Sequence, residues 1–271
     1  MSRVASMASN AFYRSVFISD VHLGSSDCQG ELLLEFLSQT DCEYLYLVGD
    51  IFDLWKIKHA WTWPEANDQL LKCVFEKARQ GTKVVYVPGN HDELIRGYLG
   101  NEINGVEVTE EVIHTTAAGK ELLVLHGDIF DELIRNMDWL ENFADNMYTF
   151  IMFLNRLYNR SRRLFGYNYW SFATFIKVQF KEARKYIQKF EQTAIQEAQS
   201  RHVDGVVCGH IHVPNLIEQD EITYFNTGDW VEHCSALVED QQGAMRLIYW
   251  VKEREMLAAE QRQDEKVLVN F

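Results

Sequence analysis

Apolar segments and helical patterns alternate along the first third of the chain. Short runs rich in valine, leucine and other β-prone residues predict buried strands at residues 14–19, 44–48 and 83–87. Between them, apolar residues recur at helical spacing over 29–39 and 65–80, and Gly81 is placed to end the second helix. Strands and helices that alternate in this way are typical of a parallel sheet covered by helices. The pattern therefore predicts an α/β fold.

The remainder of the chain mixes the two patterns. Short strands are predicted between Val106 and His126, and residues 131–200 have a strongly helical pattern. Further strands are predicted at residues 203–208, 222–225, 236–238 and 246–251. The charged segment from Glu253 to about Gln263 predicts an exposed helix. A length of 271 residues suits one α/β domain, residues 1–271, with a helical insertion at about 131–200.

The composition is that of a globular protein with an acidic surface. Hydrophobic residues make up 47% of the chain and charged residues 24%, and the formal net charge is −14. This acidic balance argues against binding to nucleic acid, which needs a basic surface. The five cysteines are scattered and form no disulfide framework or zinc motif, which favours a reducing compartment. Residues 1–13 lack a signal peptide's apolar core, and no run approaches the ~18 apolar residues of a membrane helix, so we expect a cytoplasmic protein.

Five short polar motifs follow apolar runs, and they supply the candidate chemistry. In chain order they are Asp20-Val21-His22, Gly49-Asp50, Gly89-Asn90-His91-Asp92, His126-Gly127-Asp128 and Gly209-His210-Ile211-His212. Their oxygen and imidazole groups make seven candidate metal ligands: Asp20, His22, Asp50, Asn90, His126, His210 and His212. Seven such ligands exceed the needs of one metal ion. They suit two adjacent divalent cations that share a carboxylate, and metal pairs of this kind hydrolyse phosphoesters.

The ordered set of motifs resembles the calcineurin-like metallophosphoesterase superfamily, and the match runs from about Val16 to Asp229. A closer resemblance is to the UDP-2,3-diacylglucosamine diphosphatase family of lipid A synthesis. It rests on a long helical, aromatic insertion before the last motif and on residues 17–24 (FISDVHLG), 49–55 (GDIFDLW) and 226–231 (NTGDWV). One position departs from the pattern, because the lipid A enzymes commonly carry arginine where this chain has His91. The departure leaves the metal chemistry intact but leaves the substrate open.

The resemblance implies a sandwich of two mixed sheets with helices outside, and a role for each metal ligand. The ligands of the first metal would be Asp20, His22 and His212, and those of the second Asn90, His126 and His210, with Asp50 shared. From spacing alone, Asp20 and His22 are two residues apart, so on a regular strand they would face the same side. Mixed oxygen and imidazole ligands suit Mn²⁺, Fe²⁺ or Zn²⁺ better than Mg²⁺, and the resemblance makes Mn²⁺ the first expectation among them.

His91 is the expected catalytic side chain, with Asp92 as its partner. By the resemblance, His91 contacts the phosphate and protonates the leaving oxygen, and Asp92 orients its imidazole ring. Asp53 and Asp128 would either fix metal ligands or cap the segments that follow them. The four remaining histidines are expected at surface or turn positions: His59, His114, His202 and His233.

Residues 131–170 combine many aromatic side chains with a basic run. The candidate substrate-binding residues in this run are Arg156, Arg160, Arg162 and Arg163. One interpretation is a helical hairpin that packs its apolar face on the sheet and leaves the arginines in water. The other is a lid that shelters acyl chains while the arginines bind a diphosphate or anionic lipid headgroups of the inner membrane. Both interpretations stay open, because a lid also needs a core of its own.

The leading hypothesis is a di-metal pyrophosphohydrolase that cleaves UDP-2,3-diacylglucosamine, or a similar UDP-linked lipid sugar, to UMP and the lipid sugar 1-phosphate. A phosphodiesterase or phosphatase for soluble nucleotides is the first alternative. His91 and the acidic balance permit that alternative, and the aromatic insertion argues against it. A non-catalytic binding scaffold is the second alternative, but such proteins typically lose metal ligands, and all seven candidates are present here.

Overall fold

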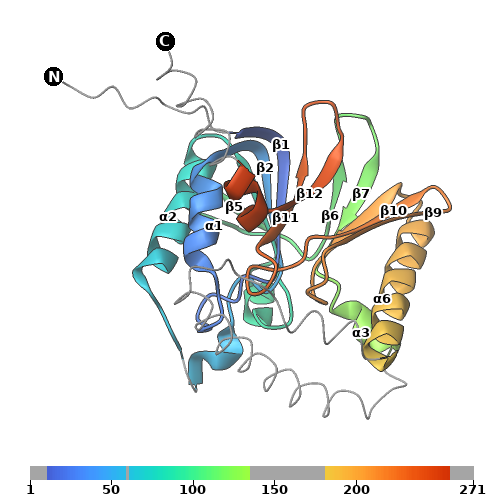
Figure 1. The fold of residues 1–271 in the computed structure, drawn as a ribbon, viewed down its shortest axis with the longest axis horizontal. Coiled ribbons are helices and arrows are strands. Elements are labelled where there is room, and N and C mark those ends of the chain that lie inside the picture. Colours follow the sequence, from blue (N-terminus) through green and yellow to red (C-terminus); the bar gives the residue numbers. More distant parts are fainter. Residues whose placement is uncertain (1–10, 59–60, 135–180, 257–271) are drawn as a thin grey trace.

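The computed structural model describes residues 11–58, 61–134 and 181–256. These residues form two mixed sheets that face each other, and helices cover the outer side of each sheet (Figure 1). The expected α/β class and the sandwich of two mixed sheets are therefore confirmed.

The first sheet has seven strands in the order β12-β11-β1-β2-β3-β5-β4. They are β1 (Ala11–Ile18), β2 (Thr40–Val48), β3 (Lys83–Val87), β4 (Glu102–Ile103), β5 (Val106–Val108), β11 (Ser235–Glu239) and β12 (Met245–Tyr249). Neighbours among β1, β2, β3 and β5 pair in parallel, as the alternating pattern predicted. β1 begins before the predicted strand, because Ala11 and Phe12 pair with β2 while staying exposed and so contribute no buried apolar run.

The second sheet has five strands in the order β6-β7-β8-β10-β9. They are β6 (Val112–Thr115), β7 (Glu121–Val124), β8 (Gly205–Cys208), β9 (Asn215–Gln219) and β10 (Ile222–Asn226). The three central strands run parallel, so their carboxyl ends lie on one edge. Apolar side chains from both sheets fill the space between them, including Phe17, Tyr46, Leu122 and Phe225, and the rings of Phe17 and Tyr46 stack at 4.6 Å.

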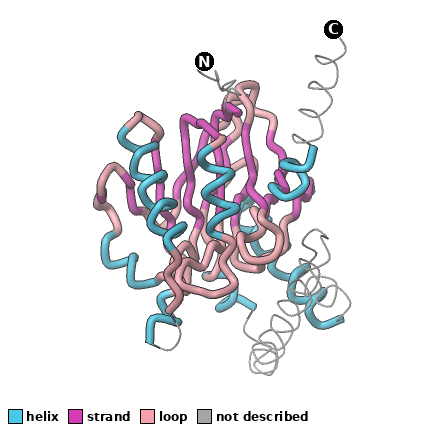
Figure 2. The backbone as a smooth tube through the Cα atoms, turned by 60° about the vertical axis from the view of Figure 1, so that its left-hand side comes forward, coloured by secondary structure: helices cyan, strands magenta, loops and turns pink. Residues whose placement is uncertain are grey.

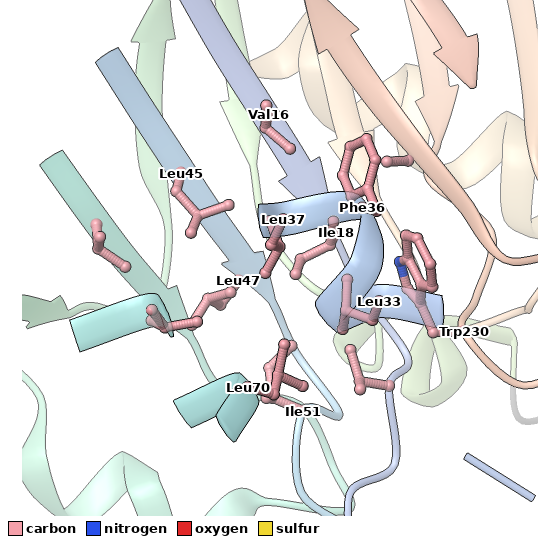
Figure 3. Packing of buried hydrophobic residues seen from close by; sticks show 14 of the residues in the cluster. Val16, Ile18, Leu33, Phe36, Leu37, Leu45, Leu47, Ile51, Leu70 and Trp230 are labelled. Carbon is pink, nitrogen blue, oxygen red and sulfur yellow. The ribbon is translucent and has the colours of Figure 1, made fainter. Parts of the chain in front are cut away.

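Helices α1 (Gly30–Ser38) and α2 (Glu65–Arg79) cover the outer face of the first sheet. Leu33, Phe36 and Leu37 of α1 pack on apolar side chains of β1 and β2, with Trp230 beside them (Figure 3). Each of the three α1 residues is 1% exposed or less. Burying a side chain of this size stabilises the fold by about 1.5–3 kcal/mol, so this layer holds the strand ends in place.

Helices α3 (Ile129–Ile134) and α6 (Lys181–Ser200) cover the second sheet in the same way. The rings of Phe130 and Phe190 meet edge to face at 5.4 Å. Two one-turn helices, η1 (Leu54–Lys58) and η2 (Glu93–Tyr98), follow the motifs after β2 and β3. Among the described helices, none has both the length and the apolar character that crossing a bilayer requires.

The C-terminal end of the fold differs from the prediction. A strand was expected over 246–251, but β12 ends at Tyr249 and a helix occupies residues 250–256. The apolar run continues into this helix because Trp250 is buried and its ring meets that of Phe36 at 5.3 Å. Within the expected helical segment 131–200, α6 and the end of α3 are helical, and residues 135–180 lie outside the described residues, as does the predicted tail beyond residue 256.

Candidate metal centre

The five motifs lie at the carboxyl ends of strands from both sheets. Those after β1, β2 and β3 come from the first sheet, and those after β7 and β8 come from the second. Figure 2 shows the loops that carry them gathered at one end of the sheets. Parallel strands generally present functional groups at this edge. The sequence motifs are thus brought together by the topology.

Five of the seven candidate ligands have a left-handed backbone, a conformation that non-glycine residues rarely adopt. They are Asp20, His22, Asp50, His210 and His212, with φ between 51° and 67°. These are half of the ten non-glycine residues with positive φ in the described part of the chain. Strain of this kind gathers at sites where a side chain must be aimed in one direction. Asp20 and His22 lie beyond β1, which ends at Ile18, so the same-side argument for a regular strand does not apply to them.

Ligand atoms from the motifs converge in three overlapping groups, and within each group they lie within 4.8 Å of one another. The groups are Asp20, His22 and His212; His22, Asp50 and His91; and Asp20, Asp50 and His126. The shared members make the groups one continuous cluster. Asp50 Oδ2 lies 3.8 Å from His22 Nε2 and 3.5 Å from His126 Nε2, so this carboxylate faces two imidazoles at once. That is the geometry a shared carboxylate needs.

The rings of His126 and His210 are held by different partners. His126 Nδ1 lies 3.0 Å from the carbonyl oxygen of Val48, which leaves Nε2 directed at Asp50. His210 Nε2 instead lies 2.8 Å from Asp131 Oδ2, and its backbone N–H donates to Asp20. His210 is therefore beside the cluster, with its ring edge to face against that of His126 at 5.1 Å.

Gly49 precedes Asp50, and Gly89 precedes Asn90. Because these glycines have no side chain, ligands from other motifs can pack directly against the backbone there. Gly49 has a φ of 78°, and a Cβ at this position would collide with the His126 ring. A Cβ on Gly89 would collide with the carboxylate of Asp50. The glycines of these motifs are therefore steric requirements of the cluster.

His91 is fixed by two residues other than the one expected. Its Nδ1 lies 3.2 Å from Asp53 Oδ1, and its ring stacks on that of Trp55 with centroids 4.0 Å apart. The expectation that Asp92 orients His91 is wrong. Asp92 is fully buried and accepts hydrogen bonds from the backbone N–H groups of Gly89 and Ile51 at 2.6 and 2.8 Å. It also accepts one from the Tyr86 hydroxyl, so Asp92 shapes the loop.

Asp53 and Asp128, whose roles the sequence left open, have different contacts in the structure. Asp53 fixes site residues, because its oxygens also lie 3.8 Å from His22 Nδ1 and 3.5 Å from Lys56 Nζ. Asp128 pairs with Arg96 at 2.8 Å. The sequence pattern contained Asp53 and Trp55 in residues 49–55, but gave no sign that both would contact His91. The predicted substrate-binding residues lie outside the described residues: Arg156, Arg160, Arg162 and Arg163.

Comparison with known proteins places this site in a family. The model of the calcineurin-like phosphoesterases matches residues 13–214. The chain belongs to this family. As a member it is a hydrolase, the family is di-metal dependent, and the cluster contains His and Asp groups that could bind metal ions.

Two curated relatives of this phosphoesterase match over most of their length. The UDP-2,3-diacylglucosamine hydrolase of Psychromonas ingrahamii is 24% identical, over 87% of this chain and 96% of the relative. The enzyme of the same name from Porphyromonas gingivalis is 26% identical, over 83% and 93%. Among solved structures, an archaeal phosphodiesterase is 13% identical with a TM-score of 0.41, over 86% and 98%.

The cluster of this phosphoesterase fits divalent cations by its unpaired atoms. Asp20 Oδ1, Asn90 Oδ1 and His126 Nε2 are buried and have no hydrogen-bond partner among the described residues. A buried polar atom without a partner is unfavourable, and metal ions supply what these three lack. Carboxylate, amide and imidazole donors together suit borderline divalent metals. The donor set therefore fits the two cations that the family implies.

The charges of the cluster favour the same conclusion. Burial alone would raise the pKa of Asp50, but His126, His22 and His91 hold it well below its usual range. Burial alone would lower the pKa of His126, but Asp50 outweighs it and raises the pKa to about 10. These opposite shifts of the two pKa values have one cause, the close contact between the Asp50 carboxylate and the His126 imidazole. A bound cation would compete with a proton for His126, because imidazole binds metals in its neutral form.

Proposed function

We propose that this phosphoesterase is a pyrophosphohydrolase that cleaves UDP-2,3-diacylglucosamine, or a similar UDP-linked lipid sugar, to UMP and the lipid sugar 1-phosphate. The observation that carries the chemistry is Asp50 between the imidazoles of His22 and His126, with buried polar atoms around it that have no hydrogen bond within the described residues. The substrate class is supported by the two relatives described above, which are UDP-2,3-diacylglucosamine hydrolases by name and match over most of their length. His91, where the lipid A enzymes commonly carry arginine, is the reason that the substrate needs its own test.

Each side chain of the cluster has a defined task in this proposal. Asp20, His22, Asp50 and His212 would hold the first cation, and Asp50 with Asn90, His126 and His210 the second. When bound, the cations activate a water molecule for attack on phosphorus and neutralise the charge that develops on the phosphoryl oxygens. We propose Mn²⁺ as the metal, with Fe²⁺ and Zn²⁺ as alternatives.

His91 is the proton donor of the proposal. In this role His91 is an imidazolium with hydrogen on both ring nitrogens, and Asp53 accepts the hydrogen of Nδ1. The Trp55 ring covers one face of the imidazole, so the ring has little freedom to rotate. Nε2 is then available to protonate the leaving oxygen as the bond to phosphorus breaks. The role of Asp53 here is the one that the sequence assigned to Asp92.

The remaining parts of the proposal depend on the substrate being a lipid-linked sugar. The arginines Arg156, Arg160, Arg162 and Arg163 would bind the diphosphate or lipid headgroups, from an insertion that acts as a lid over acyl chains. The proposal places the enzyme in the cytoplasm, with peripheral contact to the inner membrane through that insertion. No nucleic acid partner is proposed, since the net charge is −14.

The test is hydrolysis of UDP-2,3-diacylglucosamine in Mn²⁺, measured by release of UMP beside UDP-N-acetylglucosamine at equal concentration. The proposal expects strong preference for the acylated substrate. An Asp50→Asn variant prepared in parallel should release no UMP, which excludes a contaminating hydrolase. Turnover of the soluble UDP-sugar alone would refute the lipid substrate and favour a soluble-nucleotide phosphodiesterase. The metal chemistry would stand in that case.

A further inference from the structure

The loop after β10 touches the metal centre, although it supplies none of the seven candidate ligands. Its central residue, Asp229, is fully buried. Asp229 Oδ1 accepts hydrogen bonds from the backbone N–H groups of Val231, Glu232 and His233 at 2.5–3.0 Å. Asp229 Oδ2 lies 2.8 Å from Nδ1 of His233 and 3.4 Å from Nδ1 of His212. The same carboxylate oxygen therefore lies near a candidate ligand and a second histidine.

The opposite nitrogen of His212 faces the cluster. His212 Nε2 lies 3.2 Å from Asp20 Oδ1 and 3.3 Å from His22 Nε2. A carboxylate at Nδ1 keeps hydrogen on that nitrogen, so the lone pair of Nε2 is left for a cation. Partners of this kind also fix the angle of the ring. Asp229 is thus placed where a residue that orients His212 has to be.

The residue after Asp229 anchors this loop to neighbouring parts of the fold. The next residue, Trp230, is fully buried and packs against Phe36 with ring centroids 5.5 Å apart (Figure 3). The backbone N–H of Trp230 donates to the carbonyl of Asp20 at 3.1 Å, and its own carbonyl accepts from Gln29 at 2.8 Å. The loop is therefore tied to helix α1 and to the backbone of a second candidate ligand.

We propose that Asp229 is a positioning residue for His212, and that His233 holds Asp229 in place from the outer side. The affinity of the metal site that contains His212 then depends on both residues. His233, expected at a surface or turn position, is a partly buried member of this chain of contacts. The inference rests on the di-metal centre of the proposed function and is independent of its substrate.

The test measures bound Mn²⁺ in an Asp229→Asn variant by calorimetric titration and by metal analysis after gel filtration. Asparagine keeps the size of the side chain and an oxygen for the backbone N–H groups, but it has no charge for His212. We expect one of the two Mn²⁺ sites to weaken by about 10–100-fold while the other keeps its affinity. The electron paramagnetic resonance spectrum should change from that of a coupled metal pair to that of a single ion.

Asp240→Asn is the matched control. Asp240 Oδ1 accepts the backbone N–H groups of Gln242 and Ala244, both at 2.9 Å, so it holds a turn as Asp229 holds its loop. This variant should bind two Mn²⁺ ions as the wild type does. Equal loss of metal in both variants would overturn the inference, since the effect would then be structural. Wild-type affinity at both sites in Asp229→Asn would overturn it as well.

A His233→Gln variant covers the case in which Asp229→Asn does not fold. The backbone contacts of Asp229 remain in this variant, so the loop is retained. We expect Mn²⁺ binding to weaken in the same direction by a smaller factor, and unchanged affinity would overturn the inference. Wild-type protein that binds two Mn²⁺ ions but cleaves no UDP-linked lipid would refute the proposed substrate and leave this inference standing.

Discussion

Two buried clusters of histidine and carboxylate side chains can be compared in this protein. One is the metal centre. The other lies between the two sheets, and we call it the inter-sheet cluster: Arg14, Ser15, Tyr46, His114 and Glu239. In it, His114 Nε2 lies 2.8 Å from Glu239 Oε2, and His114 Nδ1 lies 2.9 Å from the Tyr46 hydroxyl. The other Glu239 oxygen accepts from Arg14 at 3.0 Å and from the backbone of Ala117 at 2.7 Å.

The two clusters use the same residue types but differ in whether their polar atoms are paired. Both ring nitrogens of His114 and both oxygens of Glu239 have partners, and both residues lie on regular strands. The metal centre leaves Asp20 Oδ1 and His126 Nε2 without hydrogen bonds and holds several ligands in a left-handed backbone. A fully paired buried network stabilises the fold, whereas one with unpaired atoms is prepared for a ligand.

The largest effect should come from Asp50. Asp50→Ala removes the shared carboxylate, so hydrolysis should fall by at least about 10³-fold. Mn²⁺, the proposed metal, should stabilise the wild type by binding only the folded state, by about 2.7 kcal/mol at 100 times its Kd. That shift of the melting temperature should disappear in the variant. Activity at the wild-type level, or an unchanged Mn²⁺-dependent shift, would contradict the assignment of this cluster as the metal centre.

A substitution in the inter-sheet cluster should lower the stability of the fold and leave metal binding and activity unchanged. Glu239→Gln removes the negative charge that pairs with Arg14 and His114, and breaking a buried pair of this kind costs about 3 kcal/mol. Urea unfolding should record this loss, while Mn²⁺ stoichiometry and kcat of the folded variant stay as in the wild type. Loss of bound metal in this variant would mean that the two clusters are coupled.

The pH dependence of stability provides a second test of the role of Glu239 in the inter-sheet cluster. Burial alone would raise the pKa of Glu239, but hydrogen bonds from His114, Ser15 and the backbone of Ala117 lower it from 4.5 to about 2. A depressed folded pKa gives stability that is present above the unfolded pKa and is lost as pH falls through the folded one. The stability difference between wild type and Glu239→Gln should be constant above pH 4.5 and shrink toward pH 2. A constant difference down to pH 2, in metal-free protein, would contradict this.

The smallest predicted effect concerns the edge of the metal centre. Trp55 is 55% exposed and covers the His91 ring, and a stacked pair of this kind contributes about 1 kcal/mol. Trp55→Ala should lower kcat by up to about tenfold with little change in KM, and Trp55→Phe should keep most of the activity. The loss should be smaller with a 4-nitrophenyl ester, whose leaving group needs no proton. Equal losses with both substrates would argue against a role through His91.

The strands and motifs were readable from the sequence because their signals are local. An apolar run followed by Gly49-Asp50 or Gly89-Asn90 shows where a buried strand ends and which side chain follows. The sequence analysis therefore found β3 at its observed bounds and six side chains of the metal cluster. It placed the start of the last helix at Glu253, whereas the helix begins at Trp250, because an apolar run buried against α1 looks the same in a strand and in a helix.

The sequence by itself determined the kinds of ligand, their order and the α/β fold, since these follow from composition and period along the chain. Only the tertiary structure decided which carboxylate serves which histidine. Asp53 rather than Asp92 contacts His91, and His114, expected near the surface, is buried against Glu239. Partners as far apart as 125 residues meet only when the sheets pack. Hydrogen bonds depend on distances of about 3 Å, which neighbouring positions in a sequence do not specify.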